Sequence, residues 1–299
     1  MRFNGGHKQS QLCVEQLSTY FTYVPVCPEQ AIGLGVPREP IRLVCLASQP
    51  RAIGTINTQL DVTDALSAFG QKTGAELTDL CGYIVMQKSP SCGLLQVKVY
   101  PADSAVPVLE GRGLFTAALM QAQPNLPIEE EGRLNQPVHL DNFMTRVFAY
   151  AQWQQLLHSG LSAKKLYEFH ARYKYQLMAN SPSGCTALGR ILTNQQELSL
   201  ELLAAQYFSL FMATLKKVAN RGAHTNVLQH ISGYLKRALN SEEKHALSTA
   251  IQHYQTNQQP LSATLAVLQQ YFKQHPNPYI AAQVYWQPYP ASLDLRSTL

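Results

Sequence analysis

Two cysteines stand in short segments whose neighbours suit chemistry better than packing. Cys27 lies in PVCPEQ (25–30), one residue before a proline and two before Glu29. Cys92 lies in SPSCG (89–93), between Ser91 and a glycine. Turn residues of this kind leave a sulfur accessible and let backbone N–H groups approach a ligand. Thiolates bind iron–sulfur clusters and zinc. Structural cysteines in turns are the alternative, because thiols also serve as apolar packing.

The remaining cysteines give no metal-binding pattern. The chain has no Cys-x-x-Cys pair, which argues against a zinc knuckle or a thioredoxin-type motif. Its six cysteines also lack the dense spacing of a secreted disulfide framework. We expect Cys13 to pack inside a helix and Cys45 inside a strand. SPSGC (181–185) resembles SPSCG in letters, but we expect it to lie between two helices, with Cys185 as a packing residue.

Alternating strands and helices position the two cysteine segments. Hydrophobic patterning predicts strands at 21–27, 41–47 and 81–87, and helices at 7–21, 61–80 and 111–124, with a proline- and glycine-rich loop at 27–40. This order indicates an α/β domain with a small, mostly parallel sheet. Ligands bind at the carboxyl ends of such strands. We therefore expect Cys27 and Cys92 to meet at one sheet edge, although 65 residues separate them.

The pattern changes near residue 142. From there, amphipathic helices are predicted in succession, at 147–160, 162–180, 196–222, 226–240, 241–257 and 261–275. We expect two domains: an α/β domain over 1–138 and an all-α domain over 142–299, with a linker at 135–139. No stretch approaches the roughly 20 apolar residues of a membrane span, and the N-terminus lacks an apolar signal-peptide region. We expect a cytoplasmic protein with no membrane partner; the sequence leaves its oligomeric state open.

The two halves of the chain differ in charge. Residues 1–141 carry 10 Lys and Arg against 13 Asp and Glu, a net −3, whereas residues 142–299 carry 14 against 6, a net +8. A basic domain favours a nucleic-acid partner; a solvated basic surface without a partner is the alternative. The candidate phosphate-binding residues are Arg172, Lys174, Arg190, Lys216, Lys217, Arg221, Lys236 and Arg237.

Aromatic side chains accompany these basic residues. His170, Tyr173 and Tyr175 either stack on RNA bases or pack between helices. His224 and His230 lack carboxylate or cysteine partners at helical spacing, so we expect them to be hydrogen-bonding core residues rather than metal ligands.

Several motifs resemble known families. RFNGGHK, VCPE, GLGVPR and KSPSCG, in this order, resemble the thiouracil desulfidase family over about residues 1–135. FHARYKYQLMANSPSGCTALGR (169–190), NVLQHISGYLK (226–236), QQPLSATL (258–265) and the ending LDLR resemble the YbgA-like domain over most of 142–299. Proteins that fuse both parts are similar to the RudS type, which removes sulfur from 4-thiouridine in tRNA.

The resemblance implies a site and a chemistry. Family members hold a 4Fe-4S cluster by three cysteines, and its open iron acts as a Lewis acid on the thiocarbonyl sulfur while water replaces that sulfur. Cys27 and Cys92 match two ligands, and Glu29 matches an acid that transfers protons. Ser89 and Ser91 would hydrogen-bond the substrate or the cluster. Lys88 would contact a phosphate of the tRNA.

One departure qualifies this expectation. The family's first ligand lies in a Cys-Leu-x-Gly turn ahead of the glycine loop, and this chain begins at that loop. Cys13 is no substitute, because it falls among apolar residues of a predicted helix. We expect the natural reading frame to start further upstream. The alternatives are an RNA-binding protein with a degenerate cluster site, and a desulfidase of free thiouracil or of a thiolated nucleotide.

Overall fold

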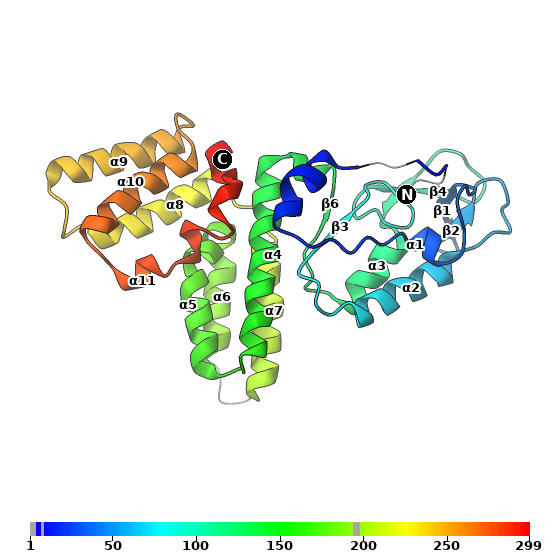
Figure 1. Cartoon of the computed structure of the whole chain (residues 1–299), viewed down its shortest axis with the longest axis horizontal. Helices are drawn as coiled ribbons and strands as arrows, with labels where there is room; N and C mark the ends of the chain where they lie inside the picture. Colours follow the sequence, from blue (N-terminus) through cyan, green and yellow to red (C-terminus); the bar gives the residue numbers. More distant parts are fainter. Residues whose placement is uncertain (1–3, 7–8, 194–197) are drawn as a thin grey trace. The chain divides into compact units, whose positions relative to one another are not determined.

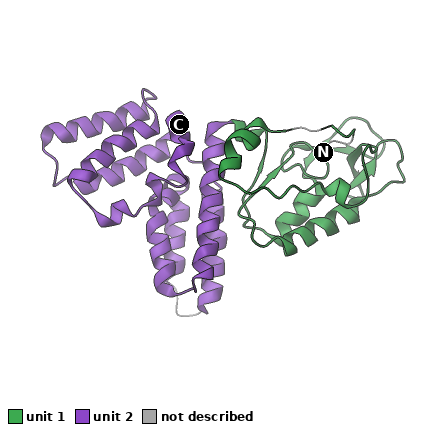
Figure 2. Ribbon diagram, viewed as in Figure 1, with its two compact units in different colours: residues 1–135 green, residues 136–299 purple. Residues whose placement is uncertain are grey.

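The computed structural model describes residues 4–6, 9–193 and 198–299 (Figure 1). It divides into two compact units, Met1–Asn135 and Gln136–Leu299 (Figure 2). Part of the RFNGGHK segment and the first two residues of the helix expected at 196–222 lie outside the described residues. The first unit combines strands with helices and the second is mostly helical, so the predicted fold class is confirmed.

The larger sheet of the first unit is mixed, so the prediction of a mostly parallel sheet is wrong: two of its three described strand pairs are antiparallel. Its central strand β1 (Ile41–Leu46) pairs antiparallel with β2 (Gln49–Gly54) and parallel with β4 (Val97–Pro101), which in turn pairs antiparallel with β5 (Leu109–Gly111). Ala47 and Ser48 connect β1 to β2 with φ values of 47° and 65°. Two left-handed residues make the tight turn that matches strand twist in a hairpin. This turn is why β2 returns beside β1 instead of crossing over.

A smaller parallel pair leads into the SPSCG segment. Strand β3 (Tyr83–Val85) pairs with β6 (Ile128–Glu130), and the chain enters the Cys92 loop directly after β3. Helices α2 (Thr63–Glu76) and α3 (Leu114–Ala122) pack closely on one another. A Cβ atom at Gly70 would lie 2.5 Å from the Phe115 carbonyl oxygen, so glycine permits this approach. The predicted strands at 41–47 and 81–87 and helices at 61–80 and 111–124 are confirmed in type.

The strand predicted at 21–27 is wrong. These residues are described and form no strand, and Tyr23 and Val24 are 43% and 54% exposed. Pro25 cannot donate to a ladder, and the β-propensity of its neighbours is realised only where a partner strand and a core are present. The helix predicted at 7–21 is reduced to a π-helical turn (Leu12–Gln16) and a 3-10 turn (Leu17–Thr19).

Helices build the second unit. They are α4 (Pro137–His158), α5 (Ala163–Asn180), α6 (Pro182–Thr193), α7 (Leu200–Leu215), α8 (Arg221–Ser232), α9 (Ser241–Gln255), α10 (Leu261–Gln274) and the short α11 (Pro278–Ala281). Helix α5 contributes side chains to two apolar cores. Tyr173 packs into a cluster with residues of α4, α6 and α7, whereas Tyr175 packs with residues of α8, α9 and α10.

Two segments that the sequence predicted to be loops contain the first residues of helices. Pro137 opens α4 inside the linker expected at 135–139, and Pro182 opens α6 inside SPSGC. Proline suits a first helical turn because its missing N–H would have no partner there. The Ser181 hydroxyl accepts from Gly184 N at 3.2 Å and caps α6. Cys185 is half-buried against the first core cluster, as a packing residue would be.

A buried polar group ties the end of the chain to this unit. Arg296 is buried, and its Nε lies 3.4 Å from an Asp141 oxygen, while its Nη2 donates to Gln176 at 3.1 Å. The Tyr289 hydroxyl donates to the same Asp141 oxygen. Hydrogen-bonded partners offset the cost of burying these charges.

In the described part of the chain, every helix is too short or too polar to cross a membrane.

Candidate active site

The SPSCG segment folds into a capped turn. The Ser89 hydroxyl accepts hydrogen bonds from the backbone N–H groups of Ser91 at 3.3 Å and Cys92 at 3.1 Å, and Gly93 N donates to the Ser89 carbonyl at 2.8 Å. Serine side chains form such turns because the hydroxyl reaches amides two or three residues ahead. The Cys92 sulfur lies 3.7 Å from the Ser91 hydroxyl oxygen. Ser89 therefore sets the position of the thiol.

The start of helix α3 supports this turn from one side. Leu114 N donates to the Pro90 carbonyl at 3.1 Å, and the Thr116 hydroxyl donates to the Cys92 carbonyl at 2.6 Å. Gly113 precedes the helix, and a Cβ atom there would lie 2.4 Å from the Ser91 carbonyl oxygen. Any larger residue at this position would clash with the Ser91 carbonyl, so glycine allows α3 to pack against the cysteine turn.

Two carboxylates of the β6 segment hold the loop at both ends. Glu130 is 5% exposed, and its Oε1 accepts from the N–H groups of Leu94 and Leu95, each at 2.9 Å. Glu131 accepts from Gln87 N at 2.8 Å. Sequence reasoning missed both residues. The available signal was a run of three glutamates next to apolar Ile128, because charges at strand positions are buried only with partners.

Cys27 and Glu29 are placed by a short helical turn, α1 (Pro28–Ala31). Cys27 is its N-cap and Glu29 lies in its first turn. Arg38 reaches back to both: its Nε donates to Glu29 at 2.7 Å, and its Nη2 lies 3.9 Å from the Cys27 sulfur. The side chains of Arg38 and Glu29 are 4% and 14% exposed. Arg38 ends the GLGVPR motif, and sequence reasoning gave it no role.

A hydrogen bond joins the two cysteine segments. The Ser91 hydroxyl donates to Glu29 Oε1 at 2.5 Å, and the Ser89 and Ser91 hydroxyls lie 2.9 Å apart. The predicted residues Cys27, Glu29, Ser89, Ser91 and Cys92 thus come together from segments that are distant in sequence. Cys92 follows strand β3 as expected, but no strand precedes Cys27 among the described residues, so the two cysteines do not follow two strands of one sheet as predicted.

Burial controls the charge of the Cys92 thiol. The pKa of Cys92 is raised to about 11, mainly by burial; the Ser91 hydroxyl lowers it, the nearby Glu29 and Cys27 raise it, and the Ser89 hydroxyl lowers it. Burial also raises the pKa of Tyr83, and the nearby Cys92 and Cys27 raise it in the same direction. Cys92 is therefore a protonated thiol near neutral pH. A thiol of this kind becomes a thiolate when a metal replaces its proton.

The described residues do not complete a cluster site. Among them, no group of three or more His, Cys, Asp and Glu side chains is arranged to hold a metal ion. Cys27 and Cys92 are two of the three thiolates that the family resemblance implies. Cys13 does not complete such a group with them among the described residues, and the Tyr23 hydroxyl donates to its backbone carbonyl at 3.1 Å.

Comparisons with known proteins follow the division of the chain. Residues 1–131 match the family described as 2-thiouracil desulfurase, and residues 174–290 match a protein family of unknown function, DUF1722. The uncharacterized protein YbgA of Escherichia coli (strain K12) is 31% identical over 157 residues, which cover 52% of this chain and 93% of YbgA. The chain belongs to the YbgA family. No solved structure matches the chain.

The protein is thus a fusion. Its first unit carries a 2-thiouracil desulfurase domain that contains the cysteine turn, and its second unit is YbgA-like. The fusion suggested by the sequence motifs is confirmed.

Most of the basic candidates of the YbgA-like unit lie at its surface. The exposed ones are Arg172, Arg190, Lys216, Lys217, Lys236 and Arg237. Arg221 is engaged within the unit, because its Nη1 donates to the Tyr254 carbonyl at 2.7 Å and its guanidinium lies 4.4 Å from the Tyr254 ring centre. Lys174 is half-buried, with its ammonium 5.8 Å from the Tyr175 ring.

The aromatic candidates pack rather than face solvent. Tyr173 and Tyr175 are 1% and 3% exposed, which favours the packing alternative over base stacking. His170 pairs with the Tyr207 hydroxyl at 3.1 Å. His224 is a buried residue that pairs with Tyr285 at 2.9 Å, as expected of a core histidine. His230 is exposed, so its expected place in the core is wrong.

Proposed function

We propose that the desulfurase domain removes sulfur from a thiolated uracil ring, with 4-thiouridine in tRNA as the substrate and uridine and sulfide as the products. The match of residues 1–131 to the 2-thiouracil desulfurase family supports the reaction class. The observation that carries the proposal is the hydrogen bond of 2.5 Å between Ser91 and Glu29, which assembles a proton-transferring carboxylate beside the Cys92 thiol.

The reaction is a hydrolysis without net redox change. Glu29 takes a proton from water, the water oxygen bonds to the thiocarbonyl carbon, and the carbon–sulfur bond breaks. Sulfur leaves as sulfide, and both water protons end on it, so that C=S and H₂O become C=O and H₂S. Ser91 and Arg38 orient the Glu29 carboxylate, because the Ser91 hydroxyl donates to its Oε1 and the Arg38 Nε donates to its Oε2.

Iron–sulfur dependence belongs to the same proposal. A cluster would supply a Lewis acid for the substrate sulfur, and Cys27 and Cys92 would be two of its ligands. The described residues do not complete the ligand set. The proton transfers of the hydrolysis are therefore assigned to this chain's own residues, and a cluster would add polarisation of the carbon–sulfur bond. Anaerobically purified protein is expected to contain iron and sulfide, and Cys92→Ser is expected to lower both contents.

Turnover assays test the reaction itself. Purified protein is incubated with thiolated uridine substrates while sulfide release and the thiocarbonyl absorbance are recorded. We expect Glu29→Gln to reduce kcat by about 10²- to 10⁴-fold, the usual contribution of a positioned acid–base group. Glu76→Gln is the matched control, because Glu76 forms an exposed helix pair with Lys72. Equal rates for the two variants would contradict the role of Glu29.

The exposed basic residues of the YbgA-like unit support tRNA as the substrate. Neutralising phosphates supplies most of the affinity for an RNA chain. Thiolated tRNA is therefore expected to be turned over with a lower KM than free thiouracil. Equal kcat/KM values for the two substrates would contradict an RNA-binding role of this unit. Binding of tRNA without any sulfide release would instead favour a protein that binds RNA through a degenerate site.

A further inference from the structure

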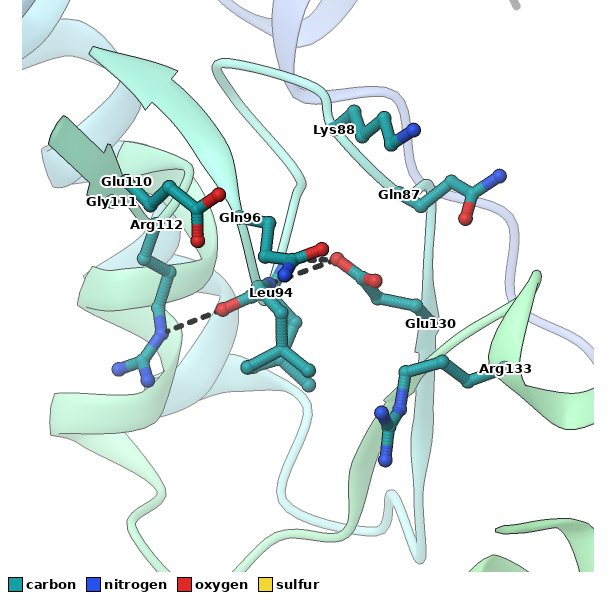
Figure 3. Close-up of a pocket in the computed structure, with 10 residues that line it drawn as sticks. Gln87, Lys88, Leu94, Gln96, Glu110, Gly111, Arg112, Glu130 and Arg133 are labelled. Carbon is teal, nitrogen blue, oxygen red and sulfur yellow. Dashed lines mark hydrogen bonds between the residues drawn. The ribbon is translucent and has the colours of Figure 1, made fainter. Parts of the chain in front are cut away.

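The YbgA-like unit has a pocket that is separate from the candidate active site. In the desulfurase domain, the pocket that Lys88 lines belongs to the cysteine turn, where Glu130 accepts from Leu94 N and Arg112 donates to the Leu94 carbonyl (Figure 3). The pocket of the YbgA-like unit lies between α9 and the end of α8 with the 3-10 turn η5 (Gly233–Leu235). Its volume is about 420 Å³, within the range of ligand sites. We call it the η5 groove.

The lining of the η5 groove is basic and polar. Lys236, which follows η5, lines one wall, and Lys244 of α9 lines the other. The other polar residues that line it are Gln229, Ser232, Ser248, Gln252 and Gln255. No acidic side chain lines the groove among the described residues. Its charge therefore suits an anionic ligand.

Most polar side chains of the η5 groove remain available to a ligand. The apolar residues beneath them, such as Leu235 and Leu247, are buried in the second core cluster. Neither the two lysine ammonium groups nor the three glutamine amides bond to another described residue. An ammonium donates to phosphate oxygens, and an amide can both donate and accept. The groove thus offers partners for a chain that carries phosphates and hydroxyls.

An exposed tyrosine on the same turn is held in one position. Tyr234 lies in η5 and is 44% exposed. The hydroxyl of the buried Tyr175 donates to the Tyr234 hydroxyl at 3.3 Å, and the centre of the Tyr279 ring lies 6.1 Å from that of Tyr234. Holding a side chain in one rotamer costs entropy, and these contacts within the unit meet that cost before any ligand binds. The exposed part of the ring is preorganised for stacking.

Tyr234 differs from the other exposed aromatic residue of this unit. Among the described residues from 136 to 299, Tyr167 and Tyr234 are the exposed tyrosines, at 42% and 44%. Tyr167 lies on α5, and its hydroxyl donates to the Leu192 carbonyl at 2.8 Å. Only Tyr234 of the two lies beside a basic groove, two residues before Lys236. Tyr167 is therefore a natural control for the exposed ring.

A ring next to a basic groove suits RNA whose bases are unpaired. Proteins that bind single strands combine a groove that follows the phosphates with aromatic rings on which bases stack. A base inside an RNA helix is already stacked and paired, so its face cannot reach a tyrosine ring. A duplex would contact the lysines through its phosphates but would leave Tyr234 without a base.

We propose that Tyr234 and the η5 groove bind a single-stranded segment of RNA, with one base stacked on the Tyr234 ring and neighbouring phosphates paired with Lys236 and Lys244. The proposal rests on tRNA as the proposed substrate and specifies that this unit binds unpaired nucleotides. Sequence reasoning named Lys236 as a phosphate-binding candidate and gave no role to Tyr234 or Lys244. Stacking contributes affinity at any salt concentration, whereas the lysines contribute through counterion release.

Binding of fluorescent RNA to the full chain tests the stacking contact. Anisotropy compares a single strand of about ten nucleotides with a duplex of the same sequence. We expect the wild type to prefer the single strand, and Tyr234→Ala to weaken its binding about 5- to 150-fold, the loss of one stacked base. Tyr234→Phe should retain most of the affinity, because it keeps the ring. Tyr167→Ala is the matched control and should bind as the wild type does.

Salt dependence tests the groove separately from the ring. Lys236→Gln with Lys244→Gln should reduce the slope of log K against log salt by about 1.4, from two phosphate contacts of about 0.7 each on a single strand. Tyr234→Ala should leave this slope unchanged. Lys164→Gln with Lys273→Gln removes the same charge at other exposed positions of the unit and should also leave it unchanged.

Three results would overturn the proposal. They are equal wild-type affinity for the single strand and the duplex, equal affinities of Tyr234→Ala and Tyr167→Ala, and equal slopes for the two lysine double variants. The lysine variants decide the matter if Tyr234→Ala fails to fold, because both lysines are exposed. None of these assays involves turnover, so absent sulfide release with an intact single-strand preference would contradict the desulfuration proposal alone.

Discussion

Arg38 is the buried cation of the candidate active site, and it contacts both groups that sequence motifs place there. Its guanidinium donates to Glu29, lies near the Cys27 sulfur and donates to the Gly35 carbonyl at 3.0 Å. Removing one partner of a buried ion pair leaves an uncompensated charge and costs about 3–5 kcal/mol. Arg38 therefore acts as a positioning residue for Glu29 rather than as a surface charge.

Replacing Arg38 is expected to reduce both activity and stability. Arg38→Gln should lower kcat about 10²-fold, because Glu29 loses its partner, and Arg38→Lys should recover only part of this, since an ammonium lacks the planar fork. Steady-state kinetics together with urea unfolding measure the two effects. Arg51→Gln breaks an exposed pair with Asp61 and should cost at most about 1 kcal/mol with no kinetic effect. Equal effects of Arg38→Gln and Arg51→Gln would contradict this role.

His224 makes the second unit sensitive to acid. Burial lowers its pKa from 6.5 to about 3, and the charges of Arg296 and Arg221 act in the same direction. The unfolded chain takes up a proton below pH 6.5 and the folded one does not. Stability is therefore complete above pH 6.5 and falls by about 1.4 kcal/mol per pH unit as the pH drops towards 3.

Urea unfolding at several pH values measures this effect. His224→Asn should flatten the dependence by about one proton between pH 6 and 4. His230→Asn is the control, because His230 is exposed and its loss should leave the slope unchanged. The same slope for the wild type and His224→Asn would show that another group causes the acid sensitivity.

At the scale of elements, the cysteine turn depends on a helix and a strand that are distant in sequence. Helix α3 touches it through Gly113, and Glu130 of β6 binds the amides that follow it. Each contact constrains the loop from a different side. The position of Cys92 is therefore a property of the packed domain and not of the SPSCG segment alone.

Adding a methyl group between α3 and the turn is expected to displace the turn. In Gly113→Ala the new Cβ would meet the Ser91 carbonyl at 2.4 Å, and overpacking of this kind costs about 1–3 kcal/mol. Gly189→Ala in α6 is the matched control, because no atom lies within 4 Å of its Cβ. That variant should gain about 0.5–1 kcal/mol from helix propensity. Thermal unfolding measures both, and two changes of the same sign would contradict the close approach at Gly113.

The loss of the Glu130 carboxylate is expected to open the loop locally. Glu130→Ala leaves two N–H groups without partners and should cost about 2–3 kcal/mol, whereas Glu130→Gln keeps an accepting oxygen and should cost less. Hydrogen exchange should accelerate at Leu94 and Leu95 in Glu130→Ala. The Gln87 amide, which Glu131 holds, serves as the internal control. Unchanged hydrogen exchange at Leu94 and Leu95 would contradict the proposed role of Glu130 in holding these two amides.

At the scale of the whole molecule, the two units differ in net charge as well as in fold. The basic excess belongs to the helical half, and Lys216 and Lys217 stand together just after α7. A basic surface binds a polyanion by releasing its counterions, so the affinity falls steeply with salt. The desulfurase domain alone carries no such excess.

Charge reversal is expected to weaken tRNA binding and its salt dependence. Lys216→Glu with Lys217→Glu should reduce the slope of log K against log salt by about 2, one for each lost phosphate contact. Lys164→Glu with Lys273→Glu makes the same change of net charge at other exposed positions of this unit. Filter binding of tRNA at several salt concentrations measures both slopes. Equal slopes for the two double variants would contradict a localised RNA-binding surface.

The sequence anticipated features that depend on local pattern and on chemically unusual residues. Helical periodicity located α2, α5, α9 and α10, and turn residues singled out Cys27 and Cys92. It failed at 21–27, where β-branched residues found no partner strand, and at 135–139, where Pro137 starts a helix. The two failures differ in cause. Strand formation at 21–27 depends on a partner strand and a core, whereas the linker prediction at Pro137 overlooked that proline is also favoured in the first turn of a helix.

Tertiary structure alone decided which groups surround the cysteines. Arg38, Glu130 and Glu131 look like ordinary charged residues in the sequence. Their importance comes from burial and from partners many residues away, such as the amides of Leu94 and Leu95. A sequence specifies residue types and short-range spacing, whereas the cost of burying a charge and the geometry that offsets it exist only once distant segments are packed together.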